Sequence, residues 1–190
     1  MLKRVISPAP KSPAASPGLL LPDGVSVLRI EPNIYCYCAF KNLTLAVWVG
    51  QATGASVRAL GEVSREMVRR HPEGHSSVVF ILDKIAAPEP EAREVLDKVF
   101  HSRNDLSCVS VVIEGSGFWA SGMRSMMGNA HRAAAGVTST MLRLNTSIDE
   151  VVEWLPPEHA RRTGVELIAE DFKQVLSSVR ERGAVQALSF

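Results

Sequence analysis

At one junction between a predicted strand and the following helix, the residue types are those of an anion-binding site. The run Gly115, Ser116 and Gly117 follows Glu114, where a buried strand is expected to give way to a helix. The free backbone N–H groups at a helix N-terminus attract anions. The same glycines are typical of a plain turn, and neither the further glycine of a dinucleotide-binding loop nor the Gly-Lys-Ser/Thr ending of a P-loop is present. We therefore interpret the run as either a turn or a weak anion-binding site.

Two carboxylates are placed for acid/base chemistry. Asp83 and Glu114 each follow an apolar run of strand length, and ligands of open α/β sheets gather beyond the carboxyl ends of strands. No neighbouring residue completes a mechanism with them. Ser116 also lacks the Gly-x-Ser-x-Gly pattern of a nucleophile elbow. We therefore expect no enzymatic activity and assign no catalytic residue.

The cysteines and histidines do not form a metal-binding pattern. Cys36 and Cys38 point to one face of an expected strand, and Cys108 lies on another strand. A structural zinc site normally has four ligands with longer spacing, whereas free cysteine is among the most buried residue types, so we expect these thiols to pack in the core. His71 and His75 flank a short Pro-Glu-Gly turn and are expected to be solvated. The sequence thus predicts no metal site and no cofactor.

Large, adaptable apolar residues recur at helical spacing near the middle of the chain. They are Trp119, Met123, Met126 and Met127, with Arg124 beside them. Methionine and tryptophan adapt to varied partners, and an arginine next to them could pair with an acidic group. Residues of these types at helical spacing more often form the core face of a helix. They are the candidate partner-binding or ligand-binding residues, with core packing as the alternative.

The composition is that of one globular domain. The chain has 190 residues, 46% hydrophobic and 22% charged, which disfavours global disorder, a collagen-like chain or a disulfide scaffold. With 21 Lys+Arg against 20 Asp+Glu, the chain lacks the excess of positive charge that is typical of a nucleic-acid-binding domain. Three cysteines suit a reducing cytoplasm better than secretion. No run approaches the roughly 18–20 apolar residues of a membrane-spanning helix. We therefore expect a cytoplasmic protein with no nucleic-acid partner and no transmembrane segment.

The chain after a Pro/Ser/Ala-rich arm has the pattern of strands and then of alternating helices and strands. Residues 1–24 are predicted to be disordered. VSVLRIEP, IYCYCAF and LTLAVWVG, joined by Pro-Asn and Lys-Asn steps, predict three antiparallel strands. Three further helices are expected: at 56–71, from the proline- and acid-rich 88–91 to about 104, and from 117 to about 136. Three further strands are expected between and after them, at 75–83, 108–113 and 138–144.

Two helices are predicted at the C-terminal end. The first follows a capping-box pattern at Ser147 and Glu150 and is expected to end at Pro156-Pro157. The second spans about 164–181 and is amphipathic. Its apolar face could pack on the domain or on a second chain.

This order of elements predicts an α/β fold with a mixed sheet, antiparallel at the start and parallel where helices return the chain. LTLAVWVG, SSVVFILD, PEPEAR, VSVVIEGSGFWASGMRS and IDEVVEWL, in that order, resemble the STAS-like superfamily over about residues 25–156. That superfamily includes bacterial anti-sigma-factor antagonists and lipid-transfer-like domains. The resemblance implies a STAS-like domain at 25–160. The composition adds the disordered arm at 1–24, and the apolar spacing adds a C-terminal amphipathic helix at 161–190.

The resemblance also implies a mostly non-catalytic switch or binding module. Phosphorylated antagonists carry an Asp-Ser-Ser/Thr-Gly stretch, but here Asp83 is followed by Lys84 and Ile85, so the phosphoacceptor serine is missing. The leading hypothesis is a bacterial regulatory or scaffolding module that binds a protein partner, including a second copy of itself as a homo-oligomer. The alternative is a carrier of a small apolar or lipid-like ligand, with the tryptophan and methionines lining its pocket.

Overall fold

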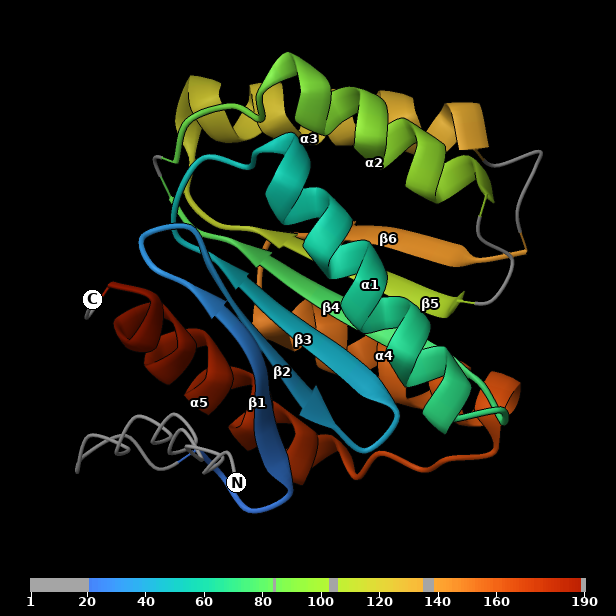
Figure 1. Ribbon diagram of the computed structural model, residues 1–190. Helices are drawn as coiled ribbons and strands as arrows, with labels where there is room; N and C mark the ends of the chain where they lie inside the picture. Colours follow the sequence, from blue (N-terminus) through green and yellow to red (C-terminus); the bar gives the residue numbers. More distant parts are fainter. Residues whose placement is uncertain (1–20, 84, 103–105, 135–138, 189–190) are drawn as a thin grey trace, which may run out of the picture.

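The chain forms a six-stranded sheet between two layers of helices (Figure 1). The computed structural model describes residues 21–83, 85–102, 106–134 and 139–188. The strands are β1 Val25–Glu31, β2 Tyr35–Phe40, β3 Leu43–Trp48, β4 His75–Ile81, β5 Leu106–Ile113 and β6 Met141–Asn145. The helices are α1 Gly54–Arg70, α2 Pro90–Ser102, α3 Gly117–Ala134, α4 Ile148–Thr163 and α5 Ala169–Leu188. The predicted arm falls almost wholly on residues 1–20, which lie outside the described residues, as do Lys84 and the predicted helix stop Gly136.

The sheet confirms the predicted fold class. Its strands lie side by side in sequence order, with β1, β2 and β3 antiparallel and β3, β4, β5 and β6 parallel. The turn between β2 and β3 is tight, and Lys41 there has a φ of 49°. A two-residue connection can only join antiparallel neighbours, whereas each parallel step needs a helical crossover. The mixed sheet therefore follows directly from where the short turns and the helices fall in the sequence.

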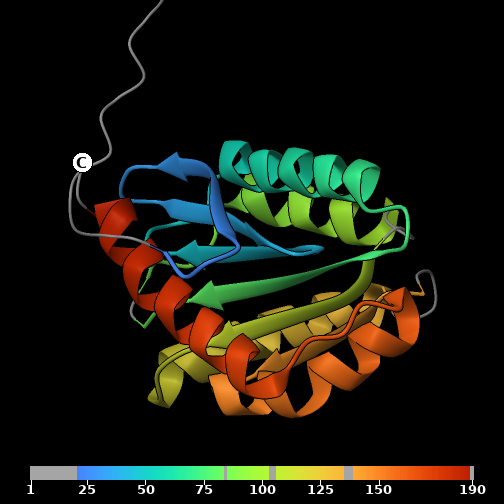
Figure 2. The ribbon, with the colours of Figure 1, turned by 90° about the horizontal axis from the view of Figure 1, so that it is seen from below.

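The three crossover helices cover one face of the sheet. Parallel crossovers are almost always right-handed, so three steps in the same direction put α1, α2 and α3 on the same side. The opposite face is covered by α4 and α5; Figure 2 shows α1 and α2 on one side of the sheet and α5 on the other. No helix of the described residues is both long enough and apolar enough to span a membrane.

The alternation of side chains along the strands separates two cores. Val78 and Phe80 of β4 face the α4–α5 layer, where Leu155, Phe172 and Leu176 complete a buried cluster. The apolar residues between these positions face the α1–α3 layer instead. The final helix thus packs on the domain itself. An added Cβ at Gly183 would lie 3.2 Å from Cγ2 of Val47, which shows how closely α5 approaches β3.

The structure corrects the predicted bounds of two helices. The helix expected to end at Pro156-Pro157 continues to Thr163, where Gly164 caps it in the left-handed conformation. Each proline removes one backbone donor, but Trp154, Leu155 and His159 are buried on the same face of α4, and such packing outweighs local helix preference. The last helix begins at Ala169 rather than near residue 164 and extends to Leu188.

Candidate functional site

An apolar pocket lies between the sheet and the α1–α3 layer. The sheet contributes Trp48 from β3, Val79 and Ile81 from β4, and Val109 and Val111 from β5. These residues point to the same side because side chains alternate along a strand. The pocket has a volume of about 100 Å³. A single water needs only about 10–15 Å³ by the same kind of measure, so the pocket has room for a small ring or a short alkyl segment.

The helix layer closes the pocket with mostly small or flexible side chains. The α1 helix contributes Val57, Leu60 and Gly61, and α3 contributes Met123 and Met127. The loop before α2 adds a third wall, whose members include Ile85, Ala86 and Pro88. Because α1 has a glycine at this level and α3 presents unbranched methionines, the layer leaves space over β4 and β5 that large branched side chains would fill.

The chemistry of the lining is almost uniform. No acidic, basic or histidine side chain is among the described residues that line the pocket. The polar side chains there include the hydroxyls of Ser64 on α1 and Ser77 on β4. Such a surface favours an uncharged apolar guest, because a charged group would lose its hydration without gaining a partner.

Ser64 is an exception to the rule that buried polar groups are hydrogen-bonded. The residue is 5% exposed, and its Oγ has no hydrogen-bond partner among the described residues. A serine in a helix commonly bonds to the carbonyl four residues earlier, and an unsatisfied buried hydroxyl costs about 1–3 kcal/mol. The Ser64 hydroxyl is therefore enclosed by protein atoms, and none of the described residues uses its bonding capacity.

The predicted binding residues divide into separate roles. Met123 and Met127 are buried and line the pocket, and Met126 packs against the same apolar cluster. The Nη2 of Arg124 donates to the carbonyl oxygens of Ile113 and Gly115, at 3.1 Å each, and so holds the β5–α3 turn. A role for Arg124 in binding stays a prediction. The side chain of Trp119 lies outside the described residues.

The glycine run has the geometry of a tight turn. Gly115 and Gly117 have φ values of 89° and 81°, and both are exposed, as is Ser116. A Cβ at Gly115 would lie 2.3 Å from Oδ1 of Asp83, whereas nothing lies within 4 Å of a Cβ at Gly117. Glycine is therefore required at 115 by both its backbone and its neighbour. Anion binding at this run stays a prediction.

The two candidate carboxylates are not brought together for catalysis. Glu114 accepts two hydrogen bonds from Arg180 of α5, at 2.7 Å from Nε and 2.6 Å from Nη2. Asp83 is exposed beside Gly115. Glu114 thus ties the end of β5 to the helix on the opposite face, a structural role that its position in the sequence did not indicate.

A buried polar network was missed by the sequence analysis. His159 of α4 bonds through Nδ1 to Ser76 Oγ and through Nε2 to Asn42 Oδ1, both at 2.8 Å. The Nδ2 of Asn42 donates to the carbonyl of Gly74, so its Oδ1 must accept the Nε2–H. His159 Nδ1 is then left to accept the hydroxyl proton of Ser76.

The network contains a serine, a histidine and an amide linked in series, as in some hydrolase active sites. Unlike such a site, it is closed to a substrate. Ser76 and His159 are 0% exposed and Asn42 is 1% exposed, so no substrate carbonyl can reach the hydroxyl. Burial lowers the pKa of His159 to about 4, so the imidazole is neutral near pH 7. We therefore assign the network a structural role, joining α4 to the starts of β3 and β4.

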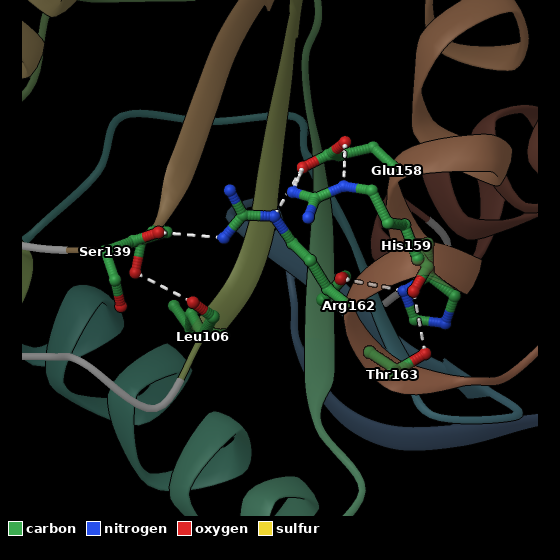
Figure 3. A network of polar contacts seen from close by, with 9 residues as sticks. Leu106, Ser139, Glu158, His159, Arg162 and Thr163 are labelled. Atoms are coloured by element: carbon green, nitrogen blue, oxygen red, sulfur yellow. Dashed lines mark hydrogen bonds and ion pairs between the residues drawn. The ribbon is translucent and has the colours of Figure 1, made fainter.

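Half-buried ion pairs extend this contact between α4 and the sheet (Figure 3). Arg162 contacts Glu158 and donates from Nη1 to the carbonyl of Ser139 at 2.8 Å, just before β6. The Arg161 and Arg162 guanidinium groups hold the pKa of the Glu158 carboxyl well below its usual value. These contacts set the position of α4 against the sheet edge.

The three cysteines and His75 are in the core, whereas His71 is half-buried and its Nδ1 lies 2.8 Å from Oε1 of Glu73. Cys36 and Cys38 are buried with their Sγ atoms 3.8 Å apart, and Cys108 is buried as well, so the predicted core packing of the thiols is confirmed. His75 is 0% exposed and bonds to the carbonyl oxygen of Asn42. The prediction of a solvated His75 was therefore wrong, because the first residue of β4 is already buried in the sheet. In the described ranges no three His, Cys, Asp or Glu side chains are grouped to hold a metal ion.

Comparisons with known proteins give a likeness of fold. No protein-family model matches the sequence, and no curated protein matches it. Among solved structures, the chain is similar to an uncharacterized protein of the DUF3478 family from Shewanella loihica PV-4, described as having a SpoIIAA-like fold. The identity is 14%, the match covers 70% of this chain and 93% of that chain, and the TM-score is 0.41. The architecture described above rests on the strand order and the helix layers of this chain itself.

Proposed function

We propose that this protein binds a small apolar ligand between its sheet and its α1–α3 layer, as a non-catalytic carrier or ligand-responsive module. The observation that carries the proposal is the pocket of about 100 Å³ lined by side chains such as Val79, Val111 and Met123. Protein interiors are packed almost without voids, and small-molecule sites are concave and mostly apolar. An apolar guest would recover contacts that the lining residues otherwise lack.

The size of the pocket limits the guest. An engineered apolar cavity of roughly 150 Å³ takes up benzene. The pocket here is smaller, at about 100 Å³, so its guest is no larger than one ring or the apolar end of a longer molecule. The three buried cysteines support a reducing compartment such as the cytoplasm as the place of action.

A second candidate function is binding of a protein partner, including a second copy of the chain. It is supported by Phe118, which is 95% exposed at the first turn of α3. Aromatic side chains such as phenylalanine are enriched at protein–protein interfaces. Partner binding requires a protein–protein interface around Phe118, whereas ligand binding requires only a small molecule in the pocket.

Native mass spectrometry of protein purified gently from its own host separates the two candidates. Ligand binding predicts a single chain with additional mass from a small molecule. The partner hypothesis instead predicts multiples of the chain mass or an added protein. A bare single chain together with larger assemblies would reject the ligand proposal in favour of the partner.

A pocket-filling variant tests the site itself. Val111→Phe places a ring in the pocket and is expected to abolish uptake of toluene, followed by NMR titration of the full chain. Ile168→Phe is the matched control, because Ile168 is 63% exposed and lies between α4 and α5. Equal toluene binding by both variants would contradict the proposed site, provided that Val111→Phe keeps the amide spectrum of the folded protein.

A further inference from the structure

The two ends of the pocket differ in their access to solvent. Ala86, in the loop between β4 and α2, is the one exposed residue among the described residues that line the pocket. At the other end, Ser77, Leu106 and Val109 come from the first half of β4 and β5, and all three are buried. Ser77 and Ile81 are separated along β4 by roughly 13 Å. The pocket is therefore open at a mouth beside Ala86 and closed near the starts of the two strands.

The border of this mouth is polar, although the lining of the pocket is apolar. The Nε2 of Gln51 donates to the carbonyl oxygen of Ala87 at 2.9 Å. From α2, the Nε of Arg93 donates to the carbonyl oxygen of Pro88 at 3.1 Å. Gln51 and Arg93 are both exposed. The loop at the mouth is thus held from two sides by side chains that also contact solvent.

We propose that the pocket binds the apolar end of an amphiphile, whose polar or charged end remains in solvent at the mouth beside Ala86. This inference rests on the proposed function and specifies its ligand class and orientation. A charged group keeps its hydration only outside the pocket, because none of the described lining residues bears a charge that could pair with it. The mouth follows the C-terminal end of β4, the end at which ligands of open α/β sheets gather.

Two ring acids test the ligand class. Benzoate carries its carboxylate directly on the ring, whereas 4-phenylbutyrate places three methylene groups between them. With its ring at the closed end of the pocket, 4-phenylbutyrate can extend its carboxylate to the mouth, but benzoate cannot. In NMR titrations of the full-length protein at pH 7, we expect saturable binding of 4-phenylbutyrate. Benzoate should bind at least about tenfold more weakly, because its carboxylate would be desolvated.

The orientation is tested by intermolecular NOEs in the complex with 4-phenylbutyrate. We expect the ring protons to contact the methyl groups of Leu106, at the closed end. The methylene next to the carboxylate should contact the methyl group of Ala86, at the mouth. Contacts of that methylene with Leu106 instead would overturn the proposed orientation.

A matched pair of variants tests the position of the mouth. Ala86→Trp covers the mouth, whereas Ala87→Trp changes the next exposed residue, which is not among the lining residues. The ratio of 4-phenylbutyrate to toluene affinity should fall about tenfold in Ala86→Trp, where the carboxylate no longer reaches solvent, and stay within about twofold in Ala87→Trp. An unchanged ratio in a folded Ala86→Trp would overturn the assignment of the mouth.

The outcomes separate this inference from the proposal on which it rests. If toluene binds but 4-phenylbutyrate does not, the pocket takes only wholly enclosed apolar guests, and the amphiphile class is wrong. Benzoate binding as tight as that of 4-phenylbutyrate would also overturn the class. If neither toluene nor 4-phenylbutyrate binds up to its solubility limit, the proposed function fails and this inference fails with it.

Discussion

The Nε2–H of His159 donates to Oδ1 of Asn42 across 2.8 Å, although the two residues are 117 positions apart in the chain. The contact joins α4 to the turn between β2 and β3, and Ser76 completes it on the other side of the ring. All three residues are buried. The neutral imidazole is therefore part of the packing between the sheet and the α4–α5 layer.

This joint predicts a pH dependence of stability. His159 has a pKa of about 4 when folded against 6.5 as the ordinary value, so between these pH values the unfolded chain binds the extra proton. The free energy of unfolding is then highest above pH 6.5 and falls as the pH drops toward 4, by roughly 3 kcal/mol in total. Urea titrations between pH 4 and 7 measure it. In His159→Gln, the free energy of unfolding should fall less steeply as the pH drops from 6.5 to 4. The same pH dependence in both proteins would contradict the prediction.

Removing the hydroxyl of Ser64 should stabilise the protein. Ser64→Ala deletes an unsatisfied buried polar atom and inserts the residue with the best helix propensity. We expect a gain of about 1 kcal/mol, which for a chain of this size raises Tm by about 2–4 °C. Differential scanning calorimetry measures the shift, with Ser121→Ala as the exposed control. A lower Tm for Ser64→Ala would show that the hydroxyl is satisfied in solution.

The glycine turn after β5 allows a matched pair of substitutions. Gly115→Ala is strained in its backbone and also meets Asp83, whereas Gly117→Ala is strained in its backbone alone. We expect Gly117→Ala to cost about 1 kcal/mol and Gly115→Ala about 1–2 kcal/mol more. Chemical denaturation of both variants measures the difference. Equal losses would mean that Asp83 moves aside at no cost.

The thiols should be inert in the native state. Cys36, Cys38 and Cys108 are buried, and burial raises the pKa of Cys108 to about 11. Only the thiolate reacts readily, so Ellman's reagent should label no thiol of the folded protein and all three Cys after unfolding. Rapid labelling of one thiol without unfolding would contradict the described packing of β2 or β5.

The sequence predicted the sheet because its signals are local. The Lys41-Asn42 turn and the alternation on either side of it determine an antiparallel pair without reference to the rest of the chain. The prediction that a helix ends at Pro156 was wrong for the same reason. The helix-breaking preference of proline is local, whereas the burial of Trp154 and Leu155 that overrides it depends on the sheet beneath. The resemblance to STAS-like domains indicated the fold, but not which helix face is left with space beneath it.

The site could be predicted only in part. Helical spacing placed Met123 and Met127 on one face, and both line the pocket. The space in front of them depends on how far the α1–α3 layer stands from β4 and β5, which no short pattern encodes. Ser64 carried no signal in the sequence, since a serine inside an amphipathic helix is usually solvated or bonded to its own backbone.

The most direct test of the central claim is a toluene titration followed by the methyl resonances of the methionines. Met123 and Met127 line the pocket, whereas Met67 on α1 and Met141 on β6 are not among its lining residues. We predict saturable shifts of the Met123 and Met127 methyl groups, with the Met67 and Met141 methyl groups nearly unchanged. Absence of any shift at Met123 and Met127 up to the solubility of toluene would contradict the account that this protein binds an apolar ligand between its sheet and its helices.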